Sequence, residues 1–229
     1  MGAQIVKRAN QSRLDYAPLN RCFRDPSAAD PVTAGIASLA DPGPEGAARR
    51  SALAEALKVK NYEFNAQGVE LNQRCGSAAV VPDRGGAEEV WARDPQLYVQ
   101  PTTRPGAKLP HAWLVGPDGR RVSTLDLVGK GRYSLVTGIS GQAWVDAAKE
   151  LALPFLNTVV IGSPNAQDLY ATWHAVREID EAGALLVRPD GVVAWRHHGA
   201  AAGKAHARRE LEQALAALLD RAPRSTEAA

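Results

Sequence analysis

Residues 133–161 read YSLVTGISGQAWVDAAKELALPFLNTVVI, and this stretch indicates a strand, a helix and a second strand in succession. The runs 133–137 and 157–161 are short and apolar, as expected of buried strands. Between them, apolar residues recur at the spacing of one helix face: Trp144, Ala147, Ala148 and Leu151. Two strands that are joined through one helix predict a parallel pair in an α/β sheet.

The flanking residues predict two hairpins and two further helices. Strand-like residues 111–115 and 122–128 flank a Gly-Pro-Asp-Gly turn, and residues 184–187 and 192–195 flank Pro-Asp-Gly. Residues 169–179 favour a helix, and the last helix has an apolar face of leucines: Leu211, Leu215, Leu218 and Leu219. The order predicts a mainly parallel sheet in an α/β fold of thioredoxin type, because that fold ends in a hairpin and a closing helix.

The N-terminal part has a different pattern. Helices are expected at about residues 5–14 and 47–60. Residues 24–46, which are rich in Pro, Ala, Asp and Gly, are expected to form a loop because of their prolines and glycines. These elements include no sheet that the helices could cover. We therefore predict three segments: a mainly helical domain at residues 1–96, a thioredoxin-like domain at 97–222, and a disordered tail at 223–229.

Composition narrows the function classes. The chain has 229 residues, 45% hydrophobic and 23% charged, with a net charge of +2, which is typical of a globular protein of one or two domains. No basic stripe interleaves with aromatic residues, so we expect no nucleic-acid partner. No apolar run reaches the roughly 20 residues of a membrane span, and no signal peptide is evident, so we expect a cytoplasmic protein without a membrane partner.

Two glycine-containing motifs resemble nucleotide-binding loops. Residues 129–134, GKGRYS, lack the third glycine of a dinucleotide fingerprint, and a strand follows them instead of a helix. Residues 199–204, GAAAGK, are one residue short of a P-loop, and Ala205 replaces the hydroxyl residue that would meet Mg²⁺. We interpret both segments as turns and predict no cofactor-binding residues in this chain.

Catalytic and metal-binding patterns are also incomplete. Residues 138–141, GISG, are not a nucleophile elbow, which needs a residue between the serine and the second glycine. His197 and His198 are adjacent, so their side chains leave a strand on opposite faces. The other histidines are isolated in the sequence: His111, His174 and His206. We predict no catalytic and no metal-binding residues.

The redox site of a thioredoxin is missing from the expected positions. A reactive cysteine would stand at the start of the helix after the first buried strand, where residues 137–142 read TGISGQ. A cis-proline would precede the final hairpin, where residues 181–184 read EAGA. The two cysteines, Cys22 and Cys75, lie far apart in the sequence and form no redox pair, and a reducing compartment fits them.

Several stretches, in a common order, resemble the C-terminal part of flavin-dependent aromatic-ring monooxygenases of the phenol and 2,4-dichlorophenol hydroxylase group. The resembling stretches are QIVKRANQS at 4–12, NYEFNAQGVELNQR at 61–74, residues 100–114, STLDL at 123–127, residues 129–131 and GALLVRPDG at 183–191. Cys75 departs from the family, in which an aromatic residue is more usual there. The family's FAD-binding motifs lie upstream of the matching stretches, and none of them is present in this sequence.

The resemblance implies the downstream portion of an enzyme that uses FAD, NAD(P)H and O₂ to hydroxylate phenolic compounds. We expect this chain to be inactive alone, to hold no cofactor itself, and to partner with an N-terminal FAD-binding half or with further copies of itself. A truncated gene product, a misassigned start and a separately encoded subunit all predict this same sequence. The alternative hypothesis is a free-standing thioredoxin-like module for protein interaction or dimerisation, without redox activity.

Overall fold

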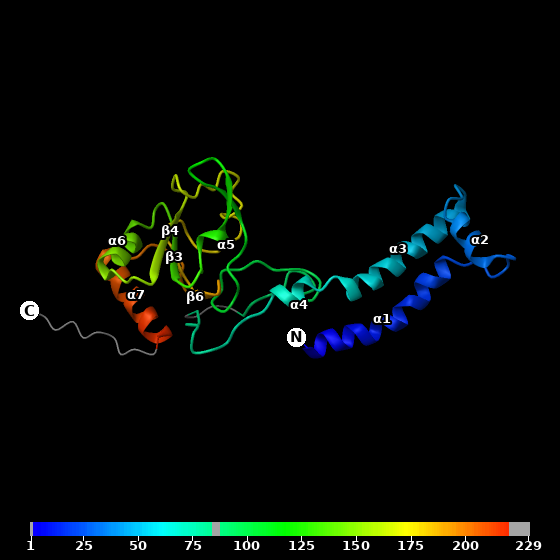
Figure 1. Ribbon diagram of the computed structural model, residues 1–229, viewed down its shortest axis with the longest axis horizontal. Coiled ribbons are helices and arrows are strands. Elements are labelled where there is room, and N and C mark those ends of the chain that lie inside the picture. The colour runs from blue at the N-terminus through cyan, green and yellow to red at the C-terminus, as the bar shows by residue number, and fades with distance from the viewer. Residues whose placement is uncertain (1, 84–87, 220–229) are drawn as a thin grey trace, which may run out of the picture. The chain divides into compact units, whose positions relative to one another are not determined.

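The computed structural model describes residues 2–83 and 88–219, which form two compact units (Figure 1). Unit 1 consists of residues 2–71 and 91–100, and unit 2 consists of residues 72–83, 88–90 and 101–219. The domain boundary at residue 96 therefore stays a prediction, and the expected tail at 223–229 lies outside the described residues.

Unit 1 is helical. Helix α1 (Gly2–Cys22) packs along α3 (Pro44–Phe64), and two shorter helices accompany them, α2 (Pro31–Ser38) and α4 (Gln67–Leu71). Helix α2 lies within the stretch for which a loop was expected. It begins there because the Asp30 carboxylate accepts hydrogen bonds from the backbone N–H groups of Val32 and Thr33, both at 3.2 Å, and Pro31 fits the first turn.

The interior of unit 1 contains as many polar or charged residues as apolar ones. Its buried apolar residues are few and mostly small: Cys22, Ala56, Val69 and Leu97. Four polar or charged residues are equally buried: Arg8, Ser12, Asp15 and Lys60. Larger apolar side chains on the same helices are exposed, including Leu14 at 69% and Phe64 at 73%. Little apolar area is thus removed from water within this unit, so hydrophobic burial stabilises it weakly.

Unit 2 is built on a four-stranded sheet with the order β4-β3-β5-β6. The strands are β3 (Tyr133–Gly138), β4 (Leu156–Ile161), β5 (Ala184–Val187) and β6 (Val193–His197). Strands β3 and β4 are parallel, as expected for a pair joined through α6 (Gln142–Leu151). The β3–β5 and β5–β6 pairs are antiparallel, so the expectation of a mainly parallel sheet is wrong.

A separate hairpin precedes the sheet. Strands β1 (Trp113–Val115) and β2 (Arg121–Ser123) pair antiparallel, which confirms the first predicted hairpin. The second strand ends earlier than expected, because Ser123 caps a short helix, α5 (Thr124–Leu127). The Ser123 hydroxyl accepts from the Leu125 N–H, and the Asp126 carboxylate accepts from the Ser123 N–H at 3.0 Å.

The helix expected at residues 169–179 does not form. The Asp168 carboxylate accepts hydrogen bonds from the backbone N–H groups of Trp173 at 3.2 Å and His174 at 2.9 Å, which folds the segment into turns. Ala171 and Glu178 have φ values of +53° and +51°, in a region that no right-handed helix visits. The buried residues Trp173 and Ile179 nevertheless pack on the sheet, as a helix face would have done.

Both faces of the sheet are covered. Helices α6 and α7 (Lys204–Leu218) pack on one face (Figure 1), in a cluster that includes Leu135, Trp144, Leu186, Trp195, Leu211 and Leu215. The β1–β2 hairpin and residues 162–183 supply the other cluster, which includes Leu114, Val136, Ile161, Trp173, Leu185 and Val193. Unit 2 thus has the apolar core that unit 1 lacks.

A buried arginine ties the irregular segments of unit 2 to the sheet. The Arg196 side chain on β6 is 5% exposed, and its guanidinium forms a fork with the Asp83 carboxylate, with Nε 2.9 Å from both oxygens. It also donates to Glu178 at 3.0 Å and to the Thr103 hydroxyl at 3.2 Å. One side chain therefore links three segments that have no regular secondary structure.

The substitution Asp83→Asn is expected to lower the free energy of unfolding of unit 2 by about 2 kcal/mol. Loss of one partner leaves a buried charge less compensated, and the remaining Glu178 contact keeps the loss below that of a fully orphaned pair. Urea unfolding followed by tryptophan fluorescence measures the change, because Trp113, Trp144, Trp173 and Trp195 lie in unit 2.

The matched control is Asp118→Asn, which removes the exposed contact of Asp118 with Arg120 at 3.6 Å. Exposed pairs contribute about 0–1 kcal/mol, so this variant should unfold close to the original chain. Equal midpoints for both variants would show that the Asp83–Arg196 fork does not stabilise unit 2.

Candidate functional site

The turn between β3 and α6 is the position at which a thioredoxin-type fold would place its reactive thiol. Gly141 precedes α6 and packs so closely that an added Cβ would lie 1.8 Å from Thr137 Oγ1. The Thr137 hydroxyl donates to the Gly183 carbonyl at 2.6 Å, and Ile139 N–H donates to the Glu181 carboxylate at 3.0 Å. These polar groups hold the turn against residues 181–183, and neither cysteine stands in it.

The two cysteines lie in different units. Cys22 is buried near the end of α1, where its thiol lies 3.4 Å from the Pro18 carbonyl, and Cys75 is exposed. Cys75 belongs to unit 2, where its N–H donates to the Gly106 carbonyl at 2.8 Å. Both are free thiols.

The glycine-containing segments do not form a cradle for the pyrophosphate of FAD or NAD(P)H. Gly129 and Gly131 have φ values of +75° and +81°, and a Cβ at Gly129 would lie 2.9 Å from the Pro189 carbonyl oxygen, so this segment is a turn packed on the β5–β6 hairpin. At the β3–α6 turn, the Glu181 carboxylate already accepts the Ile139 N–H, and its charge opposes a phosphate. Neither of these two segments therefore fits the pyrophosphate of FAD or NAD(P)H.

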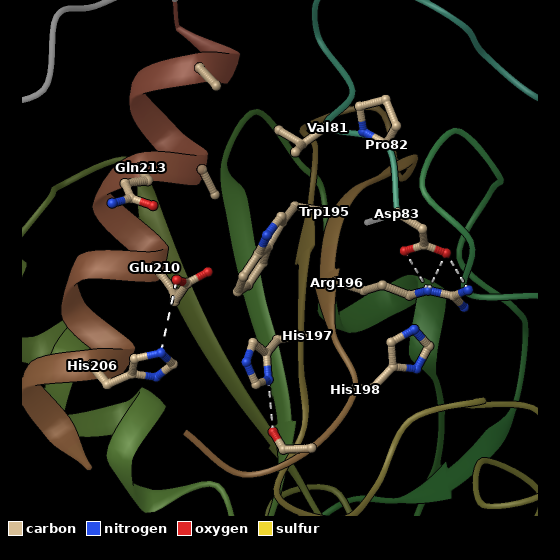
Figure 2. Close-up of a pocket in the computed structure, with 13 residues that line it drawn as sticks. Val81, Pro82, Asp83, Trp195, Arg196, His197, His198, His206, Glu210 and Gln213 are labelled. Carbon is tan, nitrogen blue, oxygen red and sulfur yellow. Dashed lines mark hydrogen bonds and ion pairs between the residues drawn. The ribbon is translucent and has the colours of Figure 1, made fainter. Parts of the chain in front are cut away.

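One pocket in unit 2 brings polar and aromatic side chains together (Figure 2). It has a volume of about 470 Å³ and lies between β6, one face of α7 and the segment 81–83. Apolar residues form much of its wall: Val81, Pro82, Trp195, Ala214 and Ala217. His197, His206, Glu210 and Gln213 add polar groups.

A β-bulge directs the β6 side chains that form this pocket. The register shifts between Leu186 and Val187, after which Trp195 lies opposite Leu186 and His197 opposite Ala184, on the face that α7 covers. Arg196 alternates to the other face, towards Asp83 (Figure 2). The bulge follows the predicted Pro-Asp-Gly turn, but its exact position had no signal in the sequence.

His206 is not isolated in the folded chain, contrary to the interpretation of the sequence. Its ring centroid lies 6.1 Å from that of His197, and its Nε2 lies 3.9 Å from a Glu210 carboxylate oxygen (Figure 2). The spacing of His206, Glu210, Gln213 and Ala217 on α7 gives one helix face, which was the available signal. The residues that the structure describes contain no group of three or more side chains that could hold a metal ion.

His198 also lines the pocket (Figure 2), whereas the two remaining histidines lie outside it. His111 Nδ1 lies 2.7 Å from the Ser123 hydroxyl, and its ring packs edge-on against Trp113 with centroids 4.8 Å apart. His174 is exposed in the turns after Asp168. Neither residue lines the pocket.

In unit 1, polar contacts join the helices to residues 91–100. Arg8 donates to the Asn65 carbonyl and lies over the Tyr62 ring, with its guanidinium 4.9 Å from the ring centroid. The Tyr62 hydroxyl donates to the Asp94 carboxylate, which lowers the pKa of Asp94 and raises the pKa of Tyr62. Asp94 also accepts from the Gln96 N–H at 2.8 Å, so its charge is used to order the segment.

No helix among the described residues has the length and the apolar character that crossing a membrane requires.

The comparisons with known proteins agree on one family. The family model "Aromatic-ring hydroxylase, C-terminal" matches residues 102–222. The chain is 46% identical over 199 residues to 2,4-dichlorophenol 6-monooxygenase of Delftia acidovorans, covering 84% of this chain and 34% of that protein. It is 44% identical over 199 residues to phenol 2-monooxygenase of Pseudomonas sp. strain EST1001, covering 84% of this chain and 32% of that protein.

A solved structure extends the similarity to almost the whole chain. The flavin-dependent monooxygenase PieE, solved in complex with FAD and substrate, superposes with a TM-score of 0.72 at 39% identity. The match covers 96% of this chain and 38% of PieE. The chain thus spans about a third of the length of the curated relatives and somewhat more of PieE.

The chain is expected to show no disulfide reductase activity. A reactive thiol needs a low-pKa setting such as a helix N-terminus, and the β3–α6 turn holds no cysteine. An insulin-reduction assay with dithiothreitol should run at the uncatalysed rate, and Cys75→Ser should leave that rate unchanged. Turnover that disappears in the Cys75→Ser variant would contradict this expectation.

Proposed function

Because the chain belongs to the aromatic-ring hydroxylase family through its C-terminal domain, we propose that it is the C-terminal part or a subunit of an FAD-dependent monooxygenase. That enzyme would use NAD(P)H and O₂ to hydroxylate phenolic compounds. The similarity to 2,4-dichlorophenol 6-monooxygenase, 46% over 199 residues, carries the proposal. On this proposal the chain alone is inactive and holds no cofactor, and FAD and NAD(P)H bind to the rest of the enzyme.

We further propose that unit 2 is a thioredoxin-like domain without the redox site. The parallel β3–β4 pair joined by α6, followed by an antiparallel hairpin β5–β6 and a closing helix α7, supports this assignment. In the sheet order β4-β3-β5-β6, strand β3 lies between β4 and β5. The first strand of the β3–α6–β4 unit is therefore central in the sheet. Residues 1–96 would then be a C-terminal remnant of the FAD and substrate domain, and the thioredoxin-like domain would begin at the proposed boundary after residue 96.

The partner that best fits unit 1 is the FAD-binding part of the enzyme. The helices of unit 1 expose apolar side chains that a partner could cover, and on α1 the exposed fraction is 60% for Val6 and 69% for Leu14. Further copies of the chain are the other candidate partner. We propose a cytoplasmic location, where the free thiols of Cys22 and Cys75 would stay reduced.

The alternative of a free-standing interaction module is less well supported. The match to PieE takes in both units, since it covers 96% of the chain. A free-standing module built on unit 2 alone would not explain why unit 1 is also similar to PieE.

The test is to supply the missing part of the enzyme. The isolated chain should purify without flavin, because neither the turn at residues 129–134 nor the β3–α6 turn fits a pyrophosphate. Co-expression with the part of the Delftia acidovorans relative that precedes the matched region should give a complex that contains stoichiometric FAD and consumes NAD(P)H when 2,4-dichlorophenol is added. Flavin that co-purifies stoichiometrically with the isolated chain would contradict the proposal.

A pair of variants tests whether the exposed face of α1 makes the contact. Leu14→Asp places a charge on an apolar exposed position and should weaken the complex at least about tenfold. Asn20→Asp adds the same charge at a polar exposed position of α1 and should leave the affinity unchanged. Affinity is measured by titrating the chain into the FAD-binding part.

A further inference from the structure

The pocket between β6 and α7 has unused hydrogen-bonding groups. The His197 Nδ1 lies 2.9 Å from the Gly199 carbonyl oxygen, which only accepts, so Nδ1 carries the proton and Nε2 is an acceptor in the neutral ring. The buried Nδ1 of His206 has no hydrogen-bond partner among the described residues. Glu210 lies 3.9 Å from His206, beyond hydrogen-bond distance. A ligand hydroxyl could therefore bond in this pocket without displacing an existing contact.

The charges of the pocket disfavour an anion. Arg196 lines it, but its guanidinium is already used by Asp83, Glu178 and Thr103. The Asp83 carboxylate is compensated in that same pair, which leaves the Glu210 carboxylate beside three histidines: His197, His198 and His206. A carboxylate or phosphate would enter next to the Glu210 carboxylate, and only a protonated histidine of the lining could compensate its charge.

The aromatic side chains favour a ring. Trp144, Trp195 and His197 pack together with centroids 4.9–6.2 Å apart, and His206 lies 6.1 Å from His197. The Trp144–Trp195 and His197–His206 pairs are edge-to-face, and His197 is tilted against both tryptophans. A further ring against Trp195 and Pro82 would extend this cluster and would bury apolar surface against Ala214 and Ala217.

We propose that this pocket binds a neutral aromatic ring that carries a hydroxyl group, with the ring against Trp195 and the hydroxyl on His197 Nε2 or Glu210. The volume of about 470 Å³ accommodates one such ring and lies in the range of small-molecule sites. The proposal rests on the residues that line this pocket of unit 2. It does not depend on the proposed function, because binding requires neither FAD nor the rest of an enzyme.

The test is a titration of the complete isolated chain with phenol, followed through the Trp195 indole and histidine ring signals by NMR. Phenol should shift these signals saturably, toluene should bind at least about tenfold more weakly, and benzoate should not compete with phenol. Absence of a saturable shift with phenol, or benzoate binding as tightly as phenol, would overturn the proposal.

Two alanine variants on α7 locate the site. Ala217 lines the pocket and is exposed, so Ala217→Leu fills the pocket without altering the core and should weaken phenol binding at least about tenfold. Ala205 is equally exposed on α7 and does not line the pocket, so Ala205→Leu should leave binding unchanged. Equal affinities for the two variants would place phenol elsewhere and reject this site.

Discussion

Strand β5 has no exposed side chain, because Ala184, Leu185, Leu186 and Val187 are each fully buried. Alternate residues of one strand must therefore be covered from two sides. On one side α6 and α7 supply the cover, and on the other side the β1–β2 hairpin and the turns at residues 162–183 supply it. The antiparallel partner β6, the bulge within it and the Arg196 fork all follow from packing irregular segments around this central strand.

The pattern of the sequence was sufficient to predict most elements of unit 2, because buried strands and amphipathic helices differ in the spacing of apolar residues along the chain. It failed at residues 169–179, where the apolar spacing resembled that of a helix. There the Asp168 carboxylate accepts hydrogen bonds from the Trp173 and His174 N–H groups. It also gave a wrong sheet direction, since the orientation of a strand depends on contacts between distant residues. The pocket could not be predicted for the same reason: His197 and His206 meet only after β6 and α7 have packed.

Unit 1 contrasts with unit 2 in what it buries. Lys60 is 4% exposed, with its ammonium group paired to Glu63 and 3.5 Å from the centroid of the Tyr16 ring. A buried charge of this kind needs all its partners, and it contributes little net stability compared with apolar packing. The exposed Leu14 and Phe64 could contribute more, but only when another surface covers them. We therefore expect unit 2 to be stable by itself, and we propose that unit 1 depends on the remainder of a monooxygenase.

Hydrogen exchange of the isolated chain, followed by mass spectrometry, tests this difference most directly. Amides of β3, β5 and α7 are expected to exchange slowest, and amides of α1 and α3 at least about a hundredfold faster, because local opening costs less free energy where few apolar contacts are lost. Adding the FAD-binding part should slow α1 and α3 selectively. Protection of α1 and α3 equal to that of β3 in the isolated chain would contradict the account, since unit 1 would then be stable without a partner.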